Sequence, residues 1–277
     1  MTRTVVVSGA TDGMGRAFTL ERLARGDRVI GIGSNPAKGA ALVRAAGPAA
    51  PRLRFLRADL SVVAEVERVV EAIGTGAIDA LLLFANRLSR RRQETPDGFE
   101  QTFALYYLSR YLLAHNLTPL LRRADRPVIV SVGGVGTTKG AIHWDDPQLT
   151  RGFSTVRAQL QAGRANDLLG VSYAGNAGGA VPFVHYHPGF TRSGDLSVLN
   201  PFASTIIRVL GRVAAQPVEA AVRPLHALVD QPPAEPLTAL DRGRRLPLSL
   251  PTLDPVAARR LAELTALLLA KSASPTE

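Results

Sequence analysis

The sequence predicts a doubly wound α/β fold, in which helices cover both faces of a parallel sheet. Short β-branched or apolar runs alternate with stretches of helical periodicity, at the spacing of β-α-β units. Residues 80–85 are wholly apolar, as expected for a central strand that is buried on both faces. The chain has 277 residues and no internal repeat or linker, so we expect one domain over residues 1–277.

Local patterns predict the individual elements. Runs of β-branched and apolar residues predict strands at 5–7, 28–33, 52–60, 80–85, 127–132 and 181–187. Helical spacing predicts a helix from residue 14 onward and further helices at 36–46, 61–73, 98–121, 154–172 and 254–271. Beyond residue 190 we expect two helical pieces and a proline-rich connector at 231–236.

The composition excludes several kinds of site. The chain has no cysteine, which rules out disulfides, thiolate zinc sites and a cysteine nucleophile. The spacing of its His and Asp residues fits no standard ligand set, so we expect no metal. No apolar run approaches the roughly 20 residues that span a bilayer, and the first strand leaves no room for a signal peptide. We therefore expect a cytoplasmic protein without a membrane span.

The net charge of +10 does not indicate nucleic-acid binding. Nearly all of the positive charge is arginine, scattered along the chain without an aromatic platform between the arginines. We therefore expect no nucleic-acid partner. A surface that attracts anionic ligands remains consistent with this charge.

A glycine-rich turn follows the first strand. Gly9, Gly13 and Gly15 lie between the buried run 5–7 and the helix that begins near residue 14. Glycines let the backbone turn tightly and approach a ligand, and the N-terminus of the helix offers free N–H groups to a pyrophosphate. The alternative is an ordinary tight turn, which uses glycine for the same conformational reason.

Seven segments carry a resemblance that runs almost from end to end. They are residues 8–15, 35–39, 58–61, 97–104, 142–146, 187–189 and 254–261. On these segments the chain resembles the short-chain dehydrogenases/reductases, closest to the branch of the retinol dehydrogenases. The resemblance implies a Rossmann-type fold and a homo-oligomer formed through the helices at 98–121 and 154–172.

The resemblance also implies a dinucleotide site. The glycine loop would hold the pyrophosphate, Asp59 and Leu60 would cap the adenine, Ala85 would pass near a ribose, and residues 188–191 would border the nicotinamide. An alternative for Asp59 is an N-cap of the helix that follows it. The implied cofactor-binding residues are Gly9, Thr11, Asp12, Gly13, Met14, Gly15, Ser34, Asn35, Lys38, Asp59, Leu60, Ala85, Asn86, Pro188, Gly189 and Thr191.

The end of the second strand favours NADP(H) over NAD(H). An acidic residue there would accept from the ribose hydroxyls, whereas this chain has Ser34 and Asn35. Lys38 and Arg16 lie close by and suit a 2′-phosphate. The alternative is that Ser34 and Asn35 only start the next helix.

The four residues that perform carbonyl reduction in this family are replaced. By resemblance, the catalytic Ser falls at Gly134, the Tyr at Gln159, the Lys at Gly163 and the helix Asn at Tyr106. An amide such as Gln159 forms hydrogen bonds but cannot act as a proton donor near neutral pH. Ser131 is expected to point to the other face of its strand and so to be a poor substitute.

Two residues are candidates for the missing chemistry. Tyr106 stands where a side chain normally faces the active site, so its phenol is a candidate surrogate acid, and a packed aromatic is the alternative. Gln159 is the second candidate by position. His185 and His187 share a strand face, His187 with a structural role, while Asp145 and Asp146 are expected to be loop charges.

Two functions remain open. The first is an atypical enzyme that binds NADP(H) and a hydrophobic small molecule, as in secondary metabolism, with residues 190–235 as the substrate cover. It would act by non-standard hydride transfer, or by a non-redox cyclisation, isomerisation or elimination. The second is a non-catalytic relative with a nucleotide-binding or regulatory role.

Overall fold

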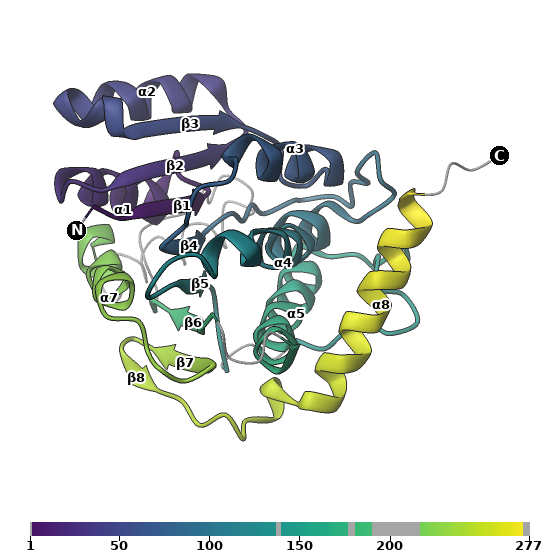
Figure 1. Cartoon of the computed structure of the whole chain (residues 1–277). Helices are drawn as coiled ribbons and strands as arrows, with labels where there is room; N and C mark the ends of the chain where they lie inside the picture. The colour runs from purple at the N-terminus through teal and green to yellow at the C-terminus, as the bar shows by residue number, and fades with distance from the viewer. Residues whose placement is uncertain (1, 137–139, 177–180, 190–216, 274–277) are drawn as a thin grey trace.

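One sheet of eight strands organises the protein in the computed structural model, which describes residues 2–136, 140–176, 181–189 and 217–273 (Figure 1). Strands β1 to β7 are parallel to their neighbours, and β8 runs antiparallel to β7. In spatial order the strands are β3 (Leu53–Arg57), β2 (Arg28–Gly33), β1 (Thr4–Ser8), β4 (Ala80–Leu83), β5 (Val128–Val132), β6 (Phe183–His187), β7 (Leu237–Asp241) and β8 (Arg244–Arg245). The predicted doubly wound parallel sheet is confirmed.

Helices cover both faces of this sheet. Helices α1 (Gly13–Ala24), α2 (Pro36–Ala46) and α7 (Val218–Asp230) share one apolar core with the sheet. Helices α3 (Val63–Ile73), α4 (Ser109–Leu121) and α5 (Thr155–Asn176) share the other. Helix α8 (Pro255–Ala273) lies on the outside of this second layer, against α5 (Figure 1).

The strand sequences supply both cores because neighbouring side chains of a strand point to opposite faces. In β1, Val6 packs into the α3–α5 layer, whereas Val5 and Val7 pack into the α1–α7 layer. In β4, Leu81 and Leu83 pack into the α3–α5 layer, and Ala80 and Leu82 pack into the α1–α7 layer. Two-sided burial explains why these strands are continuous apolar runs.

The element boundaries differ from the sequence prediction in a few places. The predicted strands 52–60 and 80–85 end early, at Arg57 and Leu83, and the strand predicted from 181 begins at Phe183. Strands β7 and β8 were not predicted. They follow the proline-rich connector, where a short run of mixed polarity gives no strand period.

The helix predicted over 98–121 has two parts. Its first part, η2 (Phe103–Leu108), is a π-helical segment, and α4 continues directly from it. π-Helical turns are uncommon and occur frequently at functional sites. Tyr106 lies within η2, so the irregular segment sets the direction of the candidate acid.

The predicted substrate cover, 190–235, is described only in its second half. There α7 packs against α1 and contributes Ala221, Val222 and Leu225 to the core, so it is a layer helix of the fold. Residues 190–216 lie outside the described part of the chain. The assignment of a cover to them remains a prediction.

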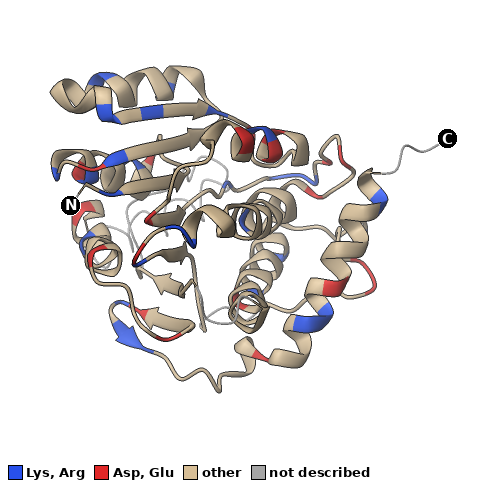
Figure 2. Cartoon of the chain, in the orientation of Figure 1, with Lys and Arg blue, Asp and Glu red and all other residues tan. Residues whose placement is uncertain are grey.

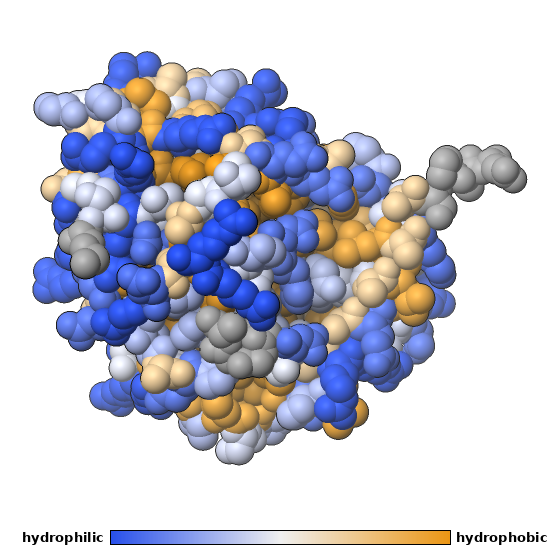
Figure 3. Space-filling view, viewed as in Figure 1, coloured by the Kyte–Doolittle hydropathy of each residue, from blue (hydrophilic) through white to orange (hydrophobic). Residues whose placement is uncertain are grey.

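The surface of the described residues is mixed in character. Lys and Arg are interspersed with Asp and Glu over several helices and strands (Figure 2). Hydrophobic surface is visible along α8 (Figure 3), where Val256 and Leu267 are exposed. Within the described ranges, no helix is long and apolar enough to cross a membrane.

The strand order reverses between β1 and β4, because the chain winds outward in one direction through β2 and β3 and in the other through β5 to β7. Such a switch point opens a crevice outside the carboxyl ends of the strands, where α/β sheets bind ligands. The glycine loop after β1 and the residues after β4 and β5 meet at this edge.

Candidate active site

The glycine loop is closely packed against the end of β4. Gly9 has φ +73° and Gly13 has φ +47°, both in the left-handed region that favours glycine. A Cβ on Gly15 would lie 2.2 Å from the Gly9 carbonyl oxygen, and one on Gly9 would lie 2.9 Å from the Ala85 nitrogen. The turn itself therefore requires glycine at these positions, whatever it binds.

Asp12 and Lys38 form an ion pair at the mouth of this loop. The Asp12 carboxylate also accepts from the Gly13 N–H at 2.8 Å and so caps α1. The hydrogen bond from Lys38 lowers the pKa of the Asp12 carboxyl. Both side chains are more than half exposed, which makes the pair weak and easily exchanged.

Asn35 and Asp59 have local partners. Asn35 is the N-cap of α2, where its side chain accepts from the Lys38 N–H at 3.0 Å, so the helix-start alternative holds for it. Asp59 accepts from the backbone N–H and the hydroxyl of Ser61, at 3.0 and 2.6 Å. The proposed N-cap role of Asp59 is wrong, because the Val63 N–H that begins α3 donates to Asp97 at 2.9 Å instead.

Gln159 is engaged with the segment after β4. Its amide exchanges two hydrogen bonds with the Asn86 amide, at 3.0 and 3.2 Å, and donates to the Arg87 carbonyl at 3.2 Å. These bonds tie α5 to residues 86–87. Gln159 does not line the cavity described below, so the structure does not bring the two candidate catalytic residues together there.

The segment after β6 is described as far as Gly189. Pro188 is buried, and Gly189 has φ +79°. Thr191, which was predicted to border the nicotinamide, lies outside the described residues.

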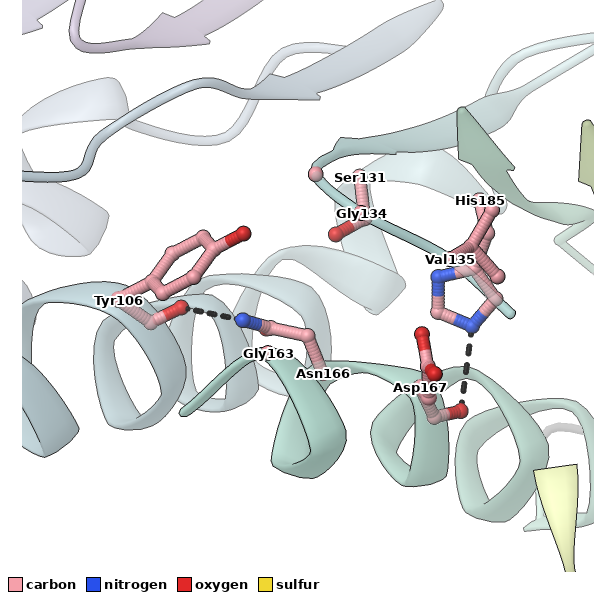
Figure 4. Close-up of a pocket in the computed structure, with 9 residues that line it drawn as sticks. Tyr106, Ser131, Gly134, Val135, Gly163, Asn166, Asp167 and His185 are labelled. Atoms are coloured by element: carbon pink, nitrogen blue, oxygen red, sulfur yellow. Dashed lines mark hydrogen bonds between the residues drawn. The ribbon is translucent and has the colours of Figure 1, made fainter. Parts of the chain in front are cut away.

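A small polar cavity lies beyond the carboxyl ends of β5 and β6 (Figure 4). It has room for about one water molecule. Gly134 and Gly163, which stand where the family's Ser and Lys are expected, both line it. The full lining is Tyr106, Ser131, Gly133, Gly134, Val135, Gly163, Asn166, Asp167 and His185, and we call this site the polar cavity.

Tyr106 enters the polar cavity from η2, as the sequence predicted. Its hydroxyl lies against Gly133, where an added Cβ would come within 2.5 Å of the phenol oxygen. The backbone carbonyl of Tyr106 accepts from the Asn166 amide at 2.8 Å (Figure 4). Gly133 thus leaves the space that the phenol occupies.

Ser131 also lines the polar cavity, so the prediction that it points away was wrong. That prediction continued the strand alternation through to Gly134, but β5 ends at Val132 and the chain turns there. Ser131 is buried and accepts a hydrogen bond from Arg110 at 2.7 Å.

Arg110 was not predicted as a site residue. It is fully buried, lies over the Tyr106 ring at 4.6 Å from the ring centre, and donates to Ser131 and to the Val132 carbonyl. Desolvation lowers the pKa of Arg110 to about 10. The signal was available, because residues 106 and 110 are separated by one helical turn and share a face.

Asp167 and His185 form the other side of the polar cavity. Burial raises the pKa of Asp167 to about 7 and lowers the pKa of His185 to about 4, so His185 is neutral near pH 7. His185 Nε2 lies 3.2 Å from the Asp167 backbone oxygen (Figure 4). His187 instead pairs with Asp241 at 2.9 Å and is not part of the lining.

Asp146 belongs to its own loop, where it accepts from Thr150 and Arg151. Among the residues that the structure describes, no group of three or more His, Cys, Asp or Glu could hold a metal ion.

Comparison with known proteins identifies the family. The family model described as short chain dehydrogenase matches residues 3–145, slightly more than half of the chain. The chain is a short-chain dehydrogenase/reductase. A relative from Streptomyces sp. (strain C5), provisionally named daunorubicin C-13 ketoreductase DnrU, is 34% identical. The match covers 95% of this chain and 91% of the relative.

One further relative and one solved structure are also similar to this chain. Dehydrogenase/reductase SDR family member 12 from Bos taurus is 29% identical, over 68% of this chain and 60% of its own length. The crystal structure of the angucycline C-6 ketoreductase LanV with bound NADP has a TM-score of 0.67 at 18% identity, and covers 87% of this chain and 94% of LanV. The chain therefore belongs to a family of oxidoreductase enzymes that bind a nicotinamide cofactor.

In the Asp167→Asn variant, we expect the free energy of unfolding to lose the part of its pH dependence that comes from the Asp167 carboxyl. The folded Asp167 carboxyl keeps its proton up to about pH 7, whereas the unfolded one loses it near 3.8. Its stabilising contribution is therefore complete below the unfolded pKa and is lost as the pH rises through about 7. Relative to the parent, the variant should gain on the order of 2–4 kcal/mol of unfolding free energy between about pH 4 and pH 8.

Urea unfolding at a series of pH values measures this difference. Taking the difference between the two proteins cancels the opposite contribution of His185, whose lowered pKa favours folding at higher pH. Parallel stability curves for the two proteins would show that Asp167 titrates normally.

Proposed function

We propose that this enzyme binds NADP(H) and reduces a carbonyl group of a hydrophobic small molecule, with Tyr106 as the proton donor. One observation carries the proposal. The polar cavity combines the Tyr106 phenol with Gly134 and Gly163, the positions where the family's usual Ser and Lys are expected. The site therefore has no side chain at two of the usual catalytic positions. At a third position, Tyr106 supplies a hydroxyl.

The loop after β1 fits a dinucleotide. Gly9, Gly13 and Gly15 keep side chains away from the turn, and the carboxylate of the N-cap residue Asp12 is paired with Lys38. These glycines and the N–H groups at the start of α1 would hold the pyrophosphate. When bound, the reduced nicotinamide supplies the hydride for the carbonyl carbon.

The preference for NADP(H) is supported by charge. The exposed positions 34 and 35 after β2 carry no carboxylate, and Arg16 and Lys38 are exposed cations near the same loop. Lys38 would leave Asp12 at little cost, because an exposed ion pair contributes about 1 kcal/mol or less. LanV, a ketoreductase of the same fold, holds NADP in its crystal structure.

Tyr106 supplies the proton in this proposal. A phenol can donate a proton to the oxygen of a carbonyl as that oxygen gains negative charge, which the Gln159 amide cannot do. The phenolate left behind would lie beside the Arg110 guanidinium, which is 4.6 Å from the centre of the Tyr106 ring. The products are the alcohol and the oxidised cofactor.

The substrate class is inferred from the relatives. DnrU carries the name of a daunorubicin C-13 ketoreductase and LanV that of an angucycline C-6 ketoreductase. We extend this class, a ketone-bearing polycyclic natural product, to the present enzyme as a proposal; most of the predicted substrate cover, 190–235, lies outside the described residues. Homo-oligomer formation through α4 and α5 likewise remains a prediction.

The Gly13→Val variant should lose NADPH binding. A branched side chain would enter the space of the phosphates and is strained at φ +47°, so we expect at least about 100-fold weaker binding. Fluorescence titration with NADPH and NADH measures the affinity and the preference. Gly26→Val is the matched control, because Gly26 also has positive φ (+94°) and an added Cβ there would meet no atom within 4 Å, yet it lies at the far end of α1.

Failure of the parent protein to bind NADPH or NADH at millimolar concentration would exclude the proposed cofactor. Binding of NADH in preference to NADPH would correct the cofactor assignment and leave the rest of the proposal in place.

The Tyr106→Phe variant tests the proton donor. With a panel of polycyclic aromatic ketones and NADPH, we expect turnover to fall by about 100- to 10,000-fold, while NADPH affinity stays within about twofold. Tyr107→Phe is the matched control, because its buried hydroxyl bonds Thr265 at 2.7 Å and is not part of the polar cavity lining. Unchanged turnover in Tyr106→Phe would remove Tyr106 from the mechanism, and product formation without NADPH oxidation would favour a non-redox reaction.

A further inference from the structure

Arg110 is a buried cation without an acidic partner. Its side chain is fully buried, and no carboxylate of the described residues forms an ion pair with it. Its Nη1 donates to Ser131 and Val132, its Nη2 reaches the Ala85 carbonyl at 3.4 Å, and its Nε has no hydrogen-bond partner. A charge buried in this way is costly unless an anion accompanies it.

The hydrogen bond from Arg110 fixes the role of Ser131. A guanidinium has no acceptor, so Ser131 Oγ must accept this bond, at 2.7 Å. The hydroxyl proton of Ser131 is then free to be donated, and it has no acceptor among the described residues. Ser131 lines the polar cavity with Tyr106 (Figure 4), so the two hydroxyls face one small space, and Arg110 contacts both residues.

We infer that the polar cavity is an oxyanion site, in which Ser131 donates to a substrate oxygen that carries negative charge and Arg110 positions and polarises Ser131. The ligand class is an enolate, phenolate or alkoxide oxygen. The small size of the polar cavity suits one oxygen atom of such a ligand, with its carbon skeleton outside. This inference rests on the proposed function, because it names the feature of the substrate that the same site recognises.

The other charged groups around the polar cavity set the conditions of the test. His185, from β6, is neutral above about pH 4, and Asp167, from α5, becomes anionic above about pH 7 and then opposes a second anion. Arg164 on α5 adds positive charge near Asp167. Binding of an oxyanion should therefore be strongest below about pH 7, and Asp167→Asn should extend it to higher pH.

The experiment uses para-nitrophenol as the probe, because its ionised and neutral forms absorb at different wavelengths. We titrate the full-length protein without cofactor at about pH 6, and expect bound para-nitrophenol to be ionised although the free phenol is mostly neutral. Ser131→Ala and Arg110→Met should weaken binding of the ionised form by about 10- to 100-fold. Arg110→Lys, which keeps the charge, should recover part of it.

Ser109→Ala is the matched control for Ser131→Ala. Its buried hydroxyl donates to the Leu105 carbonyl at 2.7 Å, on the same helix as Arg110, and it is not part of the polar cavity lining. Ser109→Ala should bind the ionised phenol like the parent. A purely structural role of Arg110, as a link between the ends of β4 and β5, would change stability but not the ionisation of the bound probe.

The possible results separate this inference from the proposed function. If the parent binds only neutral phenol, or none, or if Ser131→Ala and Arg110→Met bind the ionised form as tightly as the parent, the oxyanion site is refuted. If ionised phenol binds but NADPH does not, the oxyanion site stands and the proposed reduction fails. If NADPH binds and ketones are reduced while the phenol result is negative, the proposed function stands without this site.

Discussion

The buried guanidinium of Arg110 links the elements on which the site depends. It reaches the carbonyl of Ala85 after β4, the carbonyl of Val132 at the end of β5, the hydroxyl of Ser131 and the ring of Tyr106. These groups come from separate stretches of sequence, and the reversal of strand order between β1 and β4 places them at one edge of the sheet. An uncharged residue of similar size could fill the volume, but it could not hold two strand ends and a hydroxyl in one arrangement.

The glycine loop and the polar cavity meet different physical demands. The loop is determined by its backbone, since Gly15 approaches the Gly9 carbonyl and Gly9 approaches Ala85 too closely for any side chain. The polar cavity is determined by side chains whose polarity is unusual for their burial, among them Asp167 and His185. The protein therefore keeps the backbone shape of the glycine loop and has a polar cavity lined by buried polar side chains.

Much of the fold could be predicted from the sequence, because periodicity and two-sided burial leave clear patterns. The apolar runs of β1 and β4 and the single apolar face of α3 are examples. Strand β7 could not be predicted, since its short sequence acquires strand geometry only by pairing with β6. At the site, Tyr106 was found by position, whereas Ser131 was misjudged because the end of β5 at Val132 is set by tertiary structure. Asp167 was missed because sequence alone does not reveal that a charged residue is buried, whereas Arg110 could have been found from its position one helical turn after Tyr106.

The contact between Gly133 and Tyr106 constrains how this site can change. A side chain at 133 would collide with the phenol oxygen, at 2.5 Å from its Cβ, so the two positions cannot be exchanged independently. A larger residue at 133 requires the Tyr106 phenol to shift or to be replaced. Whether a larger side chain is accepted at position 133 therefore depends on where the Tyr106 phenol lies.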